Sequence, residues 1–207
     1  MSYCQAAKPD KCYLCGDELC DPIDWDHVPP RQFYAPIIRK AHNPQLLTIP
    51  VHARCNKKFQ LDEDYFTQTI LPFAHGSYAG DALYARAMDN FKNNKNVGLA
   101  RKVLKEFEPR PSGIVLPQHK VAKRFDSNRM SRVVWKIVRG LYYHHNNMIL
   151  TEDLRRQITI TLPPEAPPEH FLLFLGLPDN PSLGQHQGVF AYRFQKFSDD
   201  HYWALLF

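Results

Sequence analysis

The sequence predicts an α+β protein, on the evidence of where its cysteines lie and of two kinds of apolar periodicity. All five cysteines fall within the first 55 of the 207 residues. The rest of the chain alternates between helical and strand-like apolar patterns, and it ends in two strand patterns joined by a short turn. We therefore expect a cysteine-rich unit over residues 1–66, followed over residues 67–207 by an α+β domain with a mostly antiparallel sheet.

The composition is that of a folded protein, because 44% hydrophobic and 23% charged residues exclude general disorder. No apolar run approaches the ~20 residues that cross a bilayer, and the N-terminus has no hydrophobic signal segment. We therefore expect a cytoplasmic protein with no membrane partner. In a reducing compartment, clustered cysteines are more often metal ligands than disulfides. The net charge of +5 favours encounter with phosphate backbones without proving it.

Periodicity predicts the secondary structure in order along the chain. In the first unit we expect a strand near 46–51 and a helix starting near His52. Beyond it we expect helices over 81–93, 97–106 and 129–144, strands over 113–116, 157–162 and 171–175, and a terminal hairpin of 188–197 and 201–207.

The helix over 129–144 has the clearest pattern. Its apolar stripe contains Val133, Ile137 and Leu141, and Ser127 or Asn128 is the expected N-cap. We place Arg132, Lys136 and Arg139 on the opposite, solvent-exposed face, which an ordinary charged surface explains better than a binding role.

Two half-sites with the same spacing predict a structural zinc site. Cys12 and Cys15 form a C-x2-C knuckle, and His52 and Cys55 share a helix face three residues apart. Together they make a Cys3His tetrahedron that suits Zn²⁺ better than an oxygen-preferring ion. Cys20 is an alternative fourth ligand to His52, although we interpret it as a small buried residue. We assign no role to Cys4.

Between the half-sites stands Trp25-Asp26-His27-Val28-Pro29-Pro30, and Asn56 directly follows the last cysteine. The order of C-x2-C, Asp-His-Val-Pro-Pro, a strand ending in Ile-Pro, and a two-ligand half-site followed by Asn resembles zinc-containing HNH endonucleases. Asn56-Lys57-Lys58-Phe59 and the acidic segment after it are similar to one uncharacterised bacterial branch of that family. The resemblance covers residues 12 to about 66 and implies a zinc-stapled ββα-metal (HNH) element at the N-terminus.

The resemblance also implies roles for individual residues. His27 would be the general base, because a neutral imidazole is available near pH 7, and Asp26 and Asn56 would hold one Mg²⁺ or Mn²⁺ ion. The zinc would be structural, since four protein ligands leave no open position. The middle HNH position aligns best with Gln45, with Asn43 two residues too early. Gln45 in place of the usual Asn, and His52 in place of a cysteine, depart from the family pattern.

The expected partner is nucleic acid, with DNA favoured over RNA. Residues near the site that can contact phosphate are Arg31, Arg54, Lys57 and Lys58, for which a solvated surface is an equally open interpretation. We hypothesise a free-standing metal-dependent DNA endonuclease. Two alternatives are an effector nuclease in bacterial defence, gated by a protein partner or signal through the C-terminal domain, and a zinc-stabilised binding module without catalysis.

Overall fold

The computed structural model describes residues 10–42, 46–118, 120–161, 166–177, 180–186, 188–198 and 200–207. Within these residues the protein is α+β, and all paired strands are antiparallel. The predicted fold class is confirmed at this level. Among the helices of the described part, none has both the length and the apolar character to span a bilayer.

The N-terminal region is built on a two-stranded hairpin. β1 (Ile23–Val28) pairs with β2 (Leu47–His52), so that Ile23 lies opposite His52. The short helices η1 (Arg31–Phe33) and α1 (Pro36–His42) stand between the two strands in sequence, and α2 (Ala53–Lys57) follows β2 without a break. The predicted strand near 46–51 and the helix starting near His52 are confirmed. The order of these elements is β1-η1-α1-β2-α2, so the two paired strands and the helix after them have the order β-β-α, with two short helices in the connection between the strands.

Three helices come next: α3 (Gln60–Ala74), α4 (Tyr78–Lys92) and α5 (Val97–Leu104). The last two match the helices expected over 81–93 and 97–106, whereas residue 66, where we expected a domain boundary, lies inside α3. β3 (Phe107–Glu108) pairs with β4 (Ala122–Lys123), and the turn η2 (Pro111–Gly113) lies between them. The strand predicted over 113–116 is wrong, since Ser112 and Gly113 have positive φ angles of 53° and 81°, which a strand excludes.

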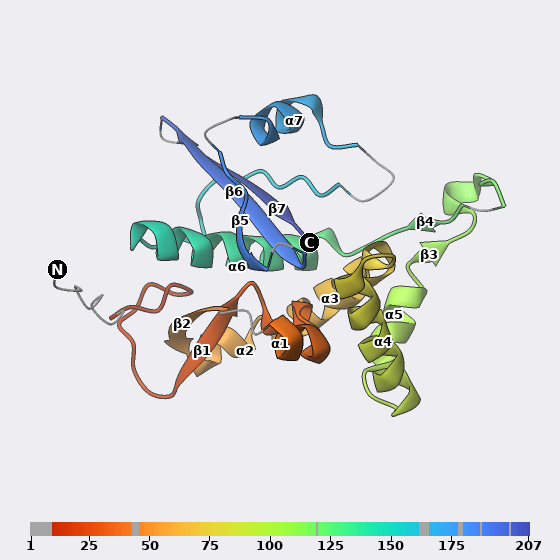
Figure 1. The fold of residues 1–207 in the computed structure, drawn as a ribbon, viewed down its shortest axis with the longest axis horizontal. Helices are drawn as coiled ribbons and strands as arrows, with labels where there is room; N and C mark the ends of the chain where they lie inside the picture. The colour runs from red at the N-terminus through yellow and green to blue at the C-terminus, as the bar shows by residue number, and fades with distance from the viewer. Residues whose placement is uncertain are drawn as a thin grey trace.

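The helix α6 (Ser127–Asn146) runs between the β1–β2 hairpin and the C-terminal sheet (Figure 1). Its predicted stripe is confirmed, because Val133, Ile137 and Leu141 are all buried. The N-cap is Asp126, whose side chain accepts from the amide of Arg129, and neither of the two predicted caps fills this role. The Asp126 carboxylate replaces them because it also suits the positive end of the helix dipole.

The C-terminal sheet has the order β5-β6-β7, with β5 (Leu183–His186), β6 (Phe190–Phe197) and β7 (Asp200–Leu206). The predicted terminal hairpin is confirmed. The strand predicted over 171–175 is wrong, since this run forms the helix α7 (Glu169–Leu175), which Pro168 caps and which exposes Leu173 on its outer side. The strand predicted over 157–162 is also wrong, as residues 157–161 have no strand partner in the described part.

One hydrophobic cluster extends through both parts of the chain. It contains Cys12 and Tyr13 of the knuckle, Val28 of β1, Ile137 of α6 and Phe190 of β6, all nearly fully buried. α6 approaches β1 most closely at Gly140, where a Cβ atom would lie 2.6 Å from Cγ2 of Val28. The cysteine-rich region is therefore packed directly onto α6, and this contact positions the site described next.

Candidate metal centre and the polar cluster beside it

The first half of the metal centre is a tight turn around Cys12 and Cys15. The amides of Cys15 and Gly16 both donate to the carbonyl of Cys12, at 3.3 and 2.7 Å. Gly16 has a φ of +85°, which a side chain would disfavour, so glycine at this position allows the turn to close. The turn brings both sulfur atoms to the same side, as a C-x2-C knuckle requires.

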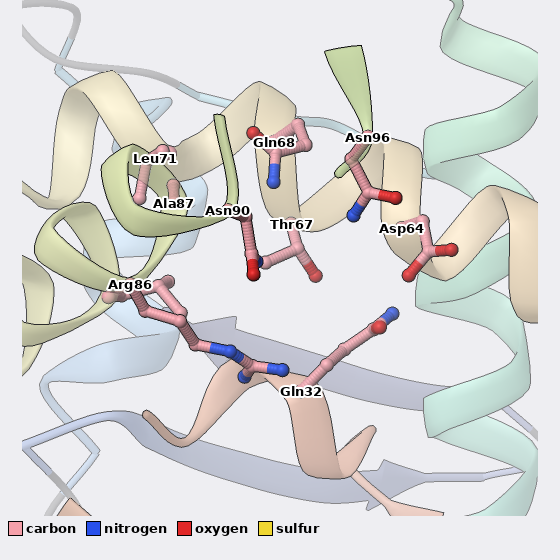
Figure 2. Close-up of a pocket in the computed structure, with 10 residues that line it drawn as sticks. Gln32, Asp64, Thr67, Gln68, Leu71, Arg86, Ala87, Asn90 and Asn96 are labelled. Atoms are coloured by element: carbon pink, nitrogen blue, oxygen red, sulfur yellow. The ribbon is translucent and has the colours of Figure 1, made fainter. Parts of the chain in front are cut away.

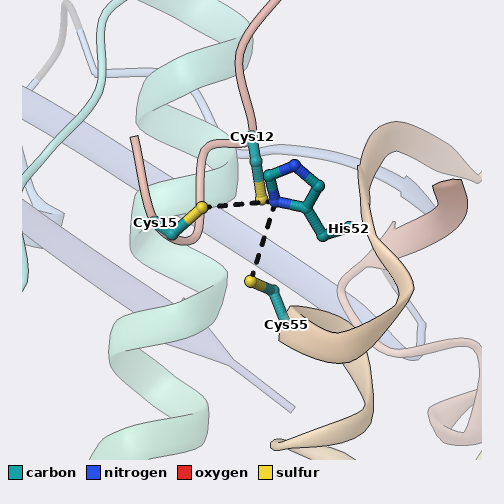
Figure 3. A group of neighbouring side chains, drawn as sticks. All are labelled: Cys12, Cys15, His52 and Cys55. Carbon is teal, nitrogen blue, oxygen red and sulfur yellow. Dashed lines mark hydrogen bonds between the residues drawn. The ribbon is translucent and has the colours of Figure 1, made fainter. Parts of the chain in front are cut away.

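The second half comes from the end of β2 and from α2. Nδ1 of His52 lies 3.3 Å from Sγ of Cys15 and 3.9 Å from Sγ of Cys55, and Figure 3 shows these side chains converging. The ligand atoms of Cys12, Cys15, His52 and Cys55 lie within 4.8 Å of one another. The four predicted ligands are thus positioned to hold a metal such as zinc, for which three sulfurs and one imidazole form a suitable donor set.

The other ring nitrogen of His52 supports this use of Nδ1. Nε2 lies 3.0 Å from the carbonyl oxygen of Glu18 and 3.2 Å from the amide of Cys20. A metal bound to Nδ1 leaves the proton on Nε2, which then donates to Glu18, an arrangement that typically orients metal-binding histidines. The amide of Cys20 can donate to Nε2 only in the opposite tautomer, so the Glu18 contact is the one that agrees with a metal on Nδ1. Cys20 contributes only this backbone contact. Its side chain is exposed, so the predicted burial of Cys20 is wrong, because the residue lies in the surface loop after the knuckle.

Next to the metal centre lies a buried polar cluster around Asp26. Asp26 is 3% exposed, and both of its carboxylate oxygens have donors. The hydroxyl of Tyr13 donates to Oδ2, and Nζ of Lys136 donates to Oδ1 at 2.7 Å. Burial and the nearby carboxylate raise the pKa of Tyr13 well above 10, so this hydroxyl keeps its proton and acts as a donor.

Lys136 reaches this cluster from α6. Its ammonium group also contacts Oδ1 of Asn56 at 3.2 Å and Oε1 of Glu63. The resemblance assigns Asp26 and Asn56 to a divalent ion, but in this arrangement the lysine ammonium fills the position between them. The residues as placed therefore do not fit Mg²⁺ or Mn²⁺.

The exposed face predicted for α6 is wrong at Lys136 and Arg139, which are 1% and 3% exposed, and right only at Arg132. Arg139 donates to the carbonyls of Tyr13 and Leu14 at 2.8 and 2.9 Å, and so it fixes the knuckle to α6. Because these positive charges have buried carboxylate and carbonyl acceptors, both side chains can leave solvent without losing hydrogen bonds.

His27 lies on the other face of β1, because adjacent strand residues point in opposite directions. It is half-buried, and desolvation, followed by the charge of Arg31, lowers its pKa. Nδ2 of Asn56 donates to Asp24, on the face of β1 that also carries Asp26, at 2.8 Å. The structure therefore brings Asp26 and Asn56 together around Lys136, with His27 on the opposite side of the strand.

The remaining predicted site residues either are exposed on the surface or fall outside the residues that the structure describes. Gln45 and Asn43, the candidates for the middle HNH position, are outside the described residues. All four predicted phosphate contacts are exposed, with Arg31 on η1, Arg54 and Lys57 on α2, and Lys58 at its C-cap. They remain predictions.

A polar pocket lies between η1, α3 and α4 (Figure 2). Its lining includes Gln32, Asp64, Thr67, Arg86 and Asn90. Nε2 of Gln32 is buried there without a hydrogen-bond partner, and desolvation raises the pKa of Asp64. The pocket has no cysteine or histidine, so it is separate from the metal centre.

Sequence reasoning missed Tyr13, Glu63 and Lys136 as members of the polar cluster. A signal for Lys136 was present, because it lies three residues after Val133 and one turn before Gly140, which is the spacing of the buried stripe.

Comparisons of the chain with protein-family models, with curated proteins and with solved structures give no match.

Proposed function

We propose that the protein is a nuclease that hydrolyses phosphodiester bonds of DNA on a zinc-organised HNH-type element. The observation that carries the proposal is His27, a half-buried histidine with a lowered pKa, on the first strand of a β-β-α arrangement that the Cys3His cluster staples. A neutral imidazole at this place can take the proton of an attacking water molecule. The four-ligand zinc would have a structural role.

The surface around His27 supports a phosphate ligand. Trp25 lies on the same face of β1 and is 59% exposed, which leaves its ring accessible to a base or sugar. Arg31 lowers the pKa of His27 and also that of Arg39, and for both groups desolvation is the larger cause. An anionic phosphate bound here would relieve the repulsion among these cations and would be held by guanidinium groups.

The chemistry assigned to this chain is limited to what its own residues can do. His27 accepts a proton from water, and Arg31 and Arg39 neutralise the phosphate oxygens on which negative charge accumulates during attack. No step of this chemistry uses a divalent ion, because Lys136 fills the position between Asp26 and Asn56. The predicted contacts Arg54, Lys57 and Lys58 would extend the phosphate-binding surface along α2.

Cleavage of supercoiled plasmid tests this proposal. Wild type, His27→Ala and His144→Ala are compared at equal zinc content, with Mg²⁺, with Mn²⁺ and with no added divalent ion. His144 is an exposed histidine at the end of α6 and serves as the matched control. We expect wild type and the control to nick DNA and His27→Ala to be slower by about 100-fold or more. Equal rates for wild type and His27→Ala would exclude His27 as the base.

The pH profile gives a second readout of the same role. Because the neutral imidazole is the active form, the rate of cleavage should rise with pH. Since the pKa of His27 is lowered from 6.5, the rise should be half complete below pH 6.5.

A gated nuclease is the second candidate, and Lys136 is the observation that favours it. This residue belongs to the C-terminal part of the chain, where we expected a partner or signal to act, and it occupies the nuclease element directly. A gated enzyme should bind zinc and cut poorly by itself. Absence of cutting under every condition, with the fold intact, would favour the zinc-stabilised binding module instead.

A further inference from the structure

The ammonium of Lys136 is held by three oxygen atoms from three different elements. They are Oδ1 of Asp26 on β1, Oδ1 of Asn56 on α2 and Oε1 of Glu63 on α3. Two carboxylates and an amide oxygen are the kind of ligands that hard divalent cations take in proteins. Here they converge on a monovalent cation that belongs to the chain itself.

Every N–H donor of the Lys136 ammonium has an acceptor. An ammonium group has three N–H donors, and Lys136 has one acceptor for each of them. The second oxygen of Asp26 accepts from Tyr13, and the amide nitrogen of Asn56 donates to Asp24. A divalent ion at this position would have to displace the ammonium, because two cations cannot share these acceptors at contact distance.

Packing holds Lys136 in this position. Its side chain is 1% exposed, and the ring of Phe59 lies 5.4 Å from Nζ. One turn further along α6, a Cβ on Gly140 would lie 2.6 Å from Val28, so the helix backbone and β1 are already at their closest approach. The ammonium can therefore leave this position only if the Lys136 side chain adopts another rotamer or if α6 separates from the β1–β2 hairpin.

We propose that Lys136 is a resident cation that takes the place of a divalent ion between Asp26, Asn56 and Glu63, so that the native chain takes up Mg²⁺ or Mn²⁺ there only when Lys136 is withdrawn. For its consequence, the control of DNA cleavage by α6, this inference rests on the gated-nuclease form of the proposed function, in which Lys136 keeps the chain from cutting by itself. Its binding step rests on the geometry alone.

Titration of the zinc-loaded protein with Mn²⁺, followed by calorimetry and by electron paramagnetic resonance, tests the inference. Lys136→Met removes the ammonium and keeps the length of the side chain. Arg132→Met, one turn earlier on α6 and exposed, is the matched control. We expect Lys136→Met to bind one Mn²⁺ at least about tenfold more tightly than wild type or the control. Adding Asp26→Asn to Lys136→Met should remove this gain.

Two results would overturn the inference. One is equal Mn²⁺ affinity in wild type and Lys136→Met, and the other is a folded Lys136→Met that binds no Mn²⁺. If Lys136→Met does not fold, Lys136→Gln, which retains an amide donor for Asp26, is measured against the same expectations. The cleavage assay is separate, so a protein that never cuts DNA but gains Mn²⁺ binding would refute the proposed function and sustain this inference.

Discussion

The Cys3His cluster and the Asp26–Lys136 cluster are neighbours that meet the same physical requirement in different ways. Each gathers ligand groups from distant parts of the chain, and each needs a cation to balance them. Sulfur ligands prefer a soft or borderline metal ion, which must come from solution. Carboxylate and amide oxygens accept hydrogen bonds from an ammonium, so a lysine of the same chain can satisfy them.

Because their cations have different sources, the two clusters should affect the stability of the fold differently when one of their residues is substituted. Binding of zinc to a structural site contributes about 10–16 kcal/mol at neutral pH, and this energy is lost with the ion. A buried ion pair contributes little net stability, but removal of one partner leaves an uncompensated charge. The stability of the first cluster therefore depends on the supply of a metal ion, whereas the second cluster carries its own cation.

The largest expected effect is loss of a zinc ligand. Cys55→Ser should reduce zinc content below one ion per chain and unfold the knuckle, because Cys55 is buried among the other ligands. Zinc analysis and thermal melting by circular dichroism measure this effect. Cys20→Ser is the control and should keep zinc and melt as wild type, since its sulfur is not among the converging ligand atoms. Zinc loss in Cys20→Ser would show that Cys20 is a ligand.

The second largest effect is expected for removal of the Lys136 ammonium. Lys136→Met should lower the free energy of unfolding by about 3–5 kcal/mol, because Asp26 and Glu63 lose their buried partner. Urea unfolding measures this difference. Arg132→Met should change stability by less than about 1 kcal/mol, since its ion pair with Asp62 is partly exposed. A loss of similar size in both variants would contradict the buried position of Lys136.

A smaller effect is expected at Arg139, which joins the two clusters through α6. Arg139→Met removes charged hydrogen bonds to the carbonyls of Tyr13 and Leu14, at a cost of about 2–3 kcal/mol. It should also weaken zinc retention in competition with a chelator, because these carbonyls belong to the knuckle. Arg155→Met, at an exposed position, is the control for loss of charge. Unchanged zinc retention would show that the knuckle holds its shape without α6.

The smallest expected effect is steric. Gly140→Ala places a methyl group 2.6 Å from Cγ2 of Val28 and should destabilise the protein by about 1–2 kcal/mol. Val28→Ala removes the atoms that clash, so the double variant should be more stable than the sum of the two single losses predicts. Additive losses in this double-mutant cycle would mean that α6 and β1 adjust without strain.

Much of the fold could be predicted because local patterns and tertiary packing agree. The apolar stripe of α6 and the terminal hairpin have the periods of the structures they form. The Cys3His ligands follow from two pairs of residues with the same spacing, which the structure brings together. The helix face predicted for His52 and Cys55 is wrong at His52, because this residue ends β2 and caps α2, whereas Cys55 lies on α2. The strand predicted over 171–175 is wrong because an apolar run of this length fits a buried strand and a helix equally. Pro168 at the N-cap and Gly176 at the C-cap favour the helix that forms.

The polar cluster could not be predicted in the same way, because its partners are far apart in sequence. Its helical spacing from Arg132 and Arg139 predicts an exposed position for Lys136, although its spacing from Val133 also puts it near the buried stripe. Lys136 is buried because its ammonium pairs with Asp26, which is 110 residues away in sequence, and with Glu63. A buried charge is stable only with its partner, and no local pattern shows that partner.

Tyr13 has a consequence for how the two clusters communicate. It lies between Cys12 and Cys15 in the knuckle, and its hydroxyl donates to Asp26. Any change in metal occupancy that shifts the knuckle therefore changes the hydrogen bonding of Asp26. Because a coupling free energy acts equally in both directions, a metal ion held at the knuckle and the state of Asp26 and Lys136 would affect each other. One tyrosine thus connects the candidate metal site to the buried ion pair through a single hydrogen bond.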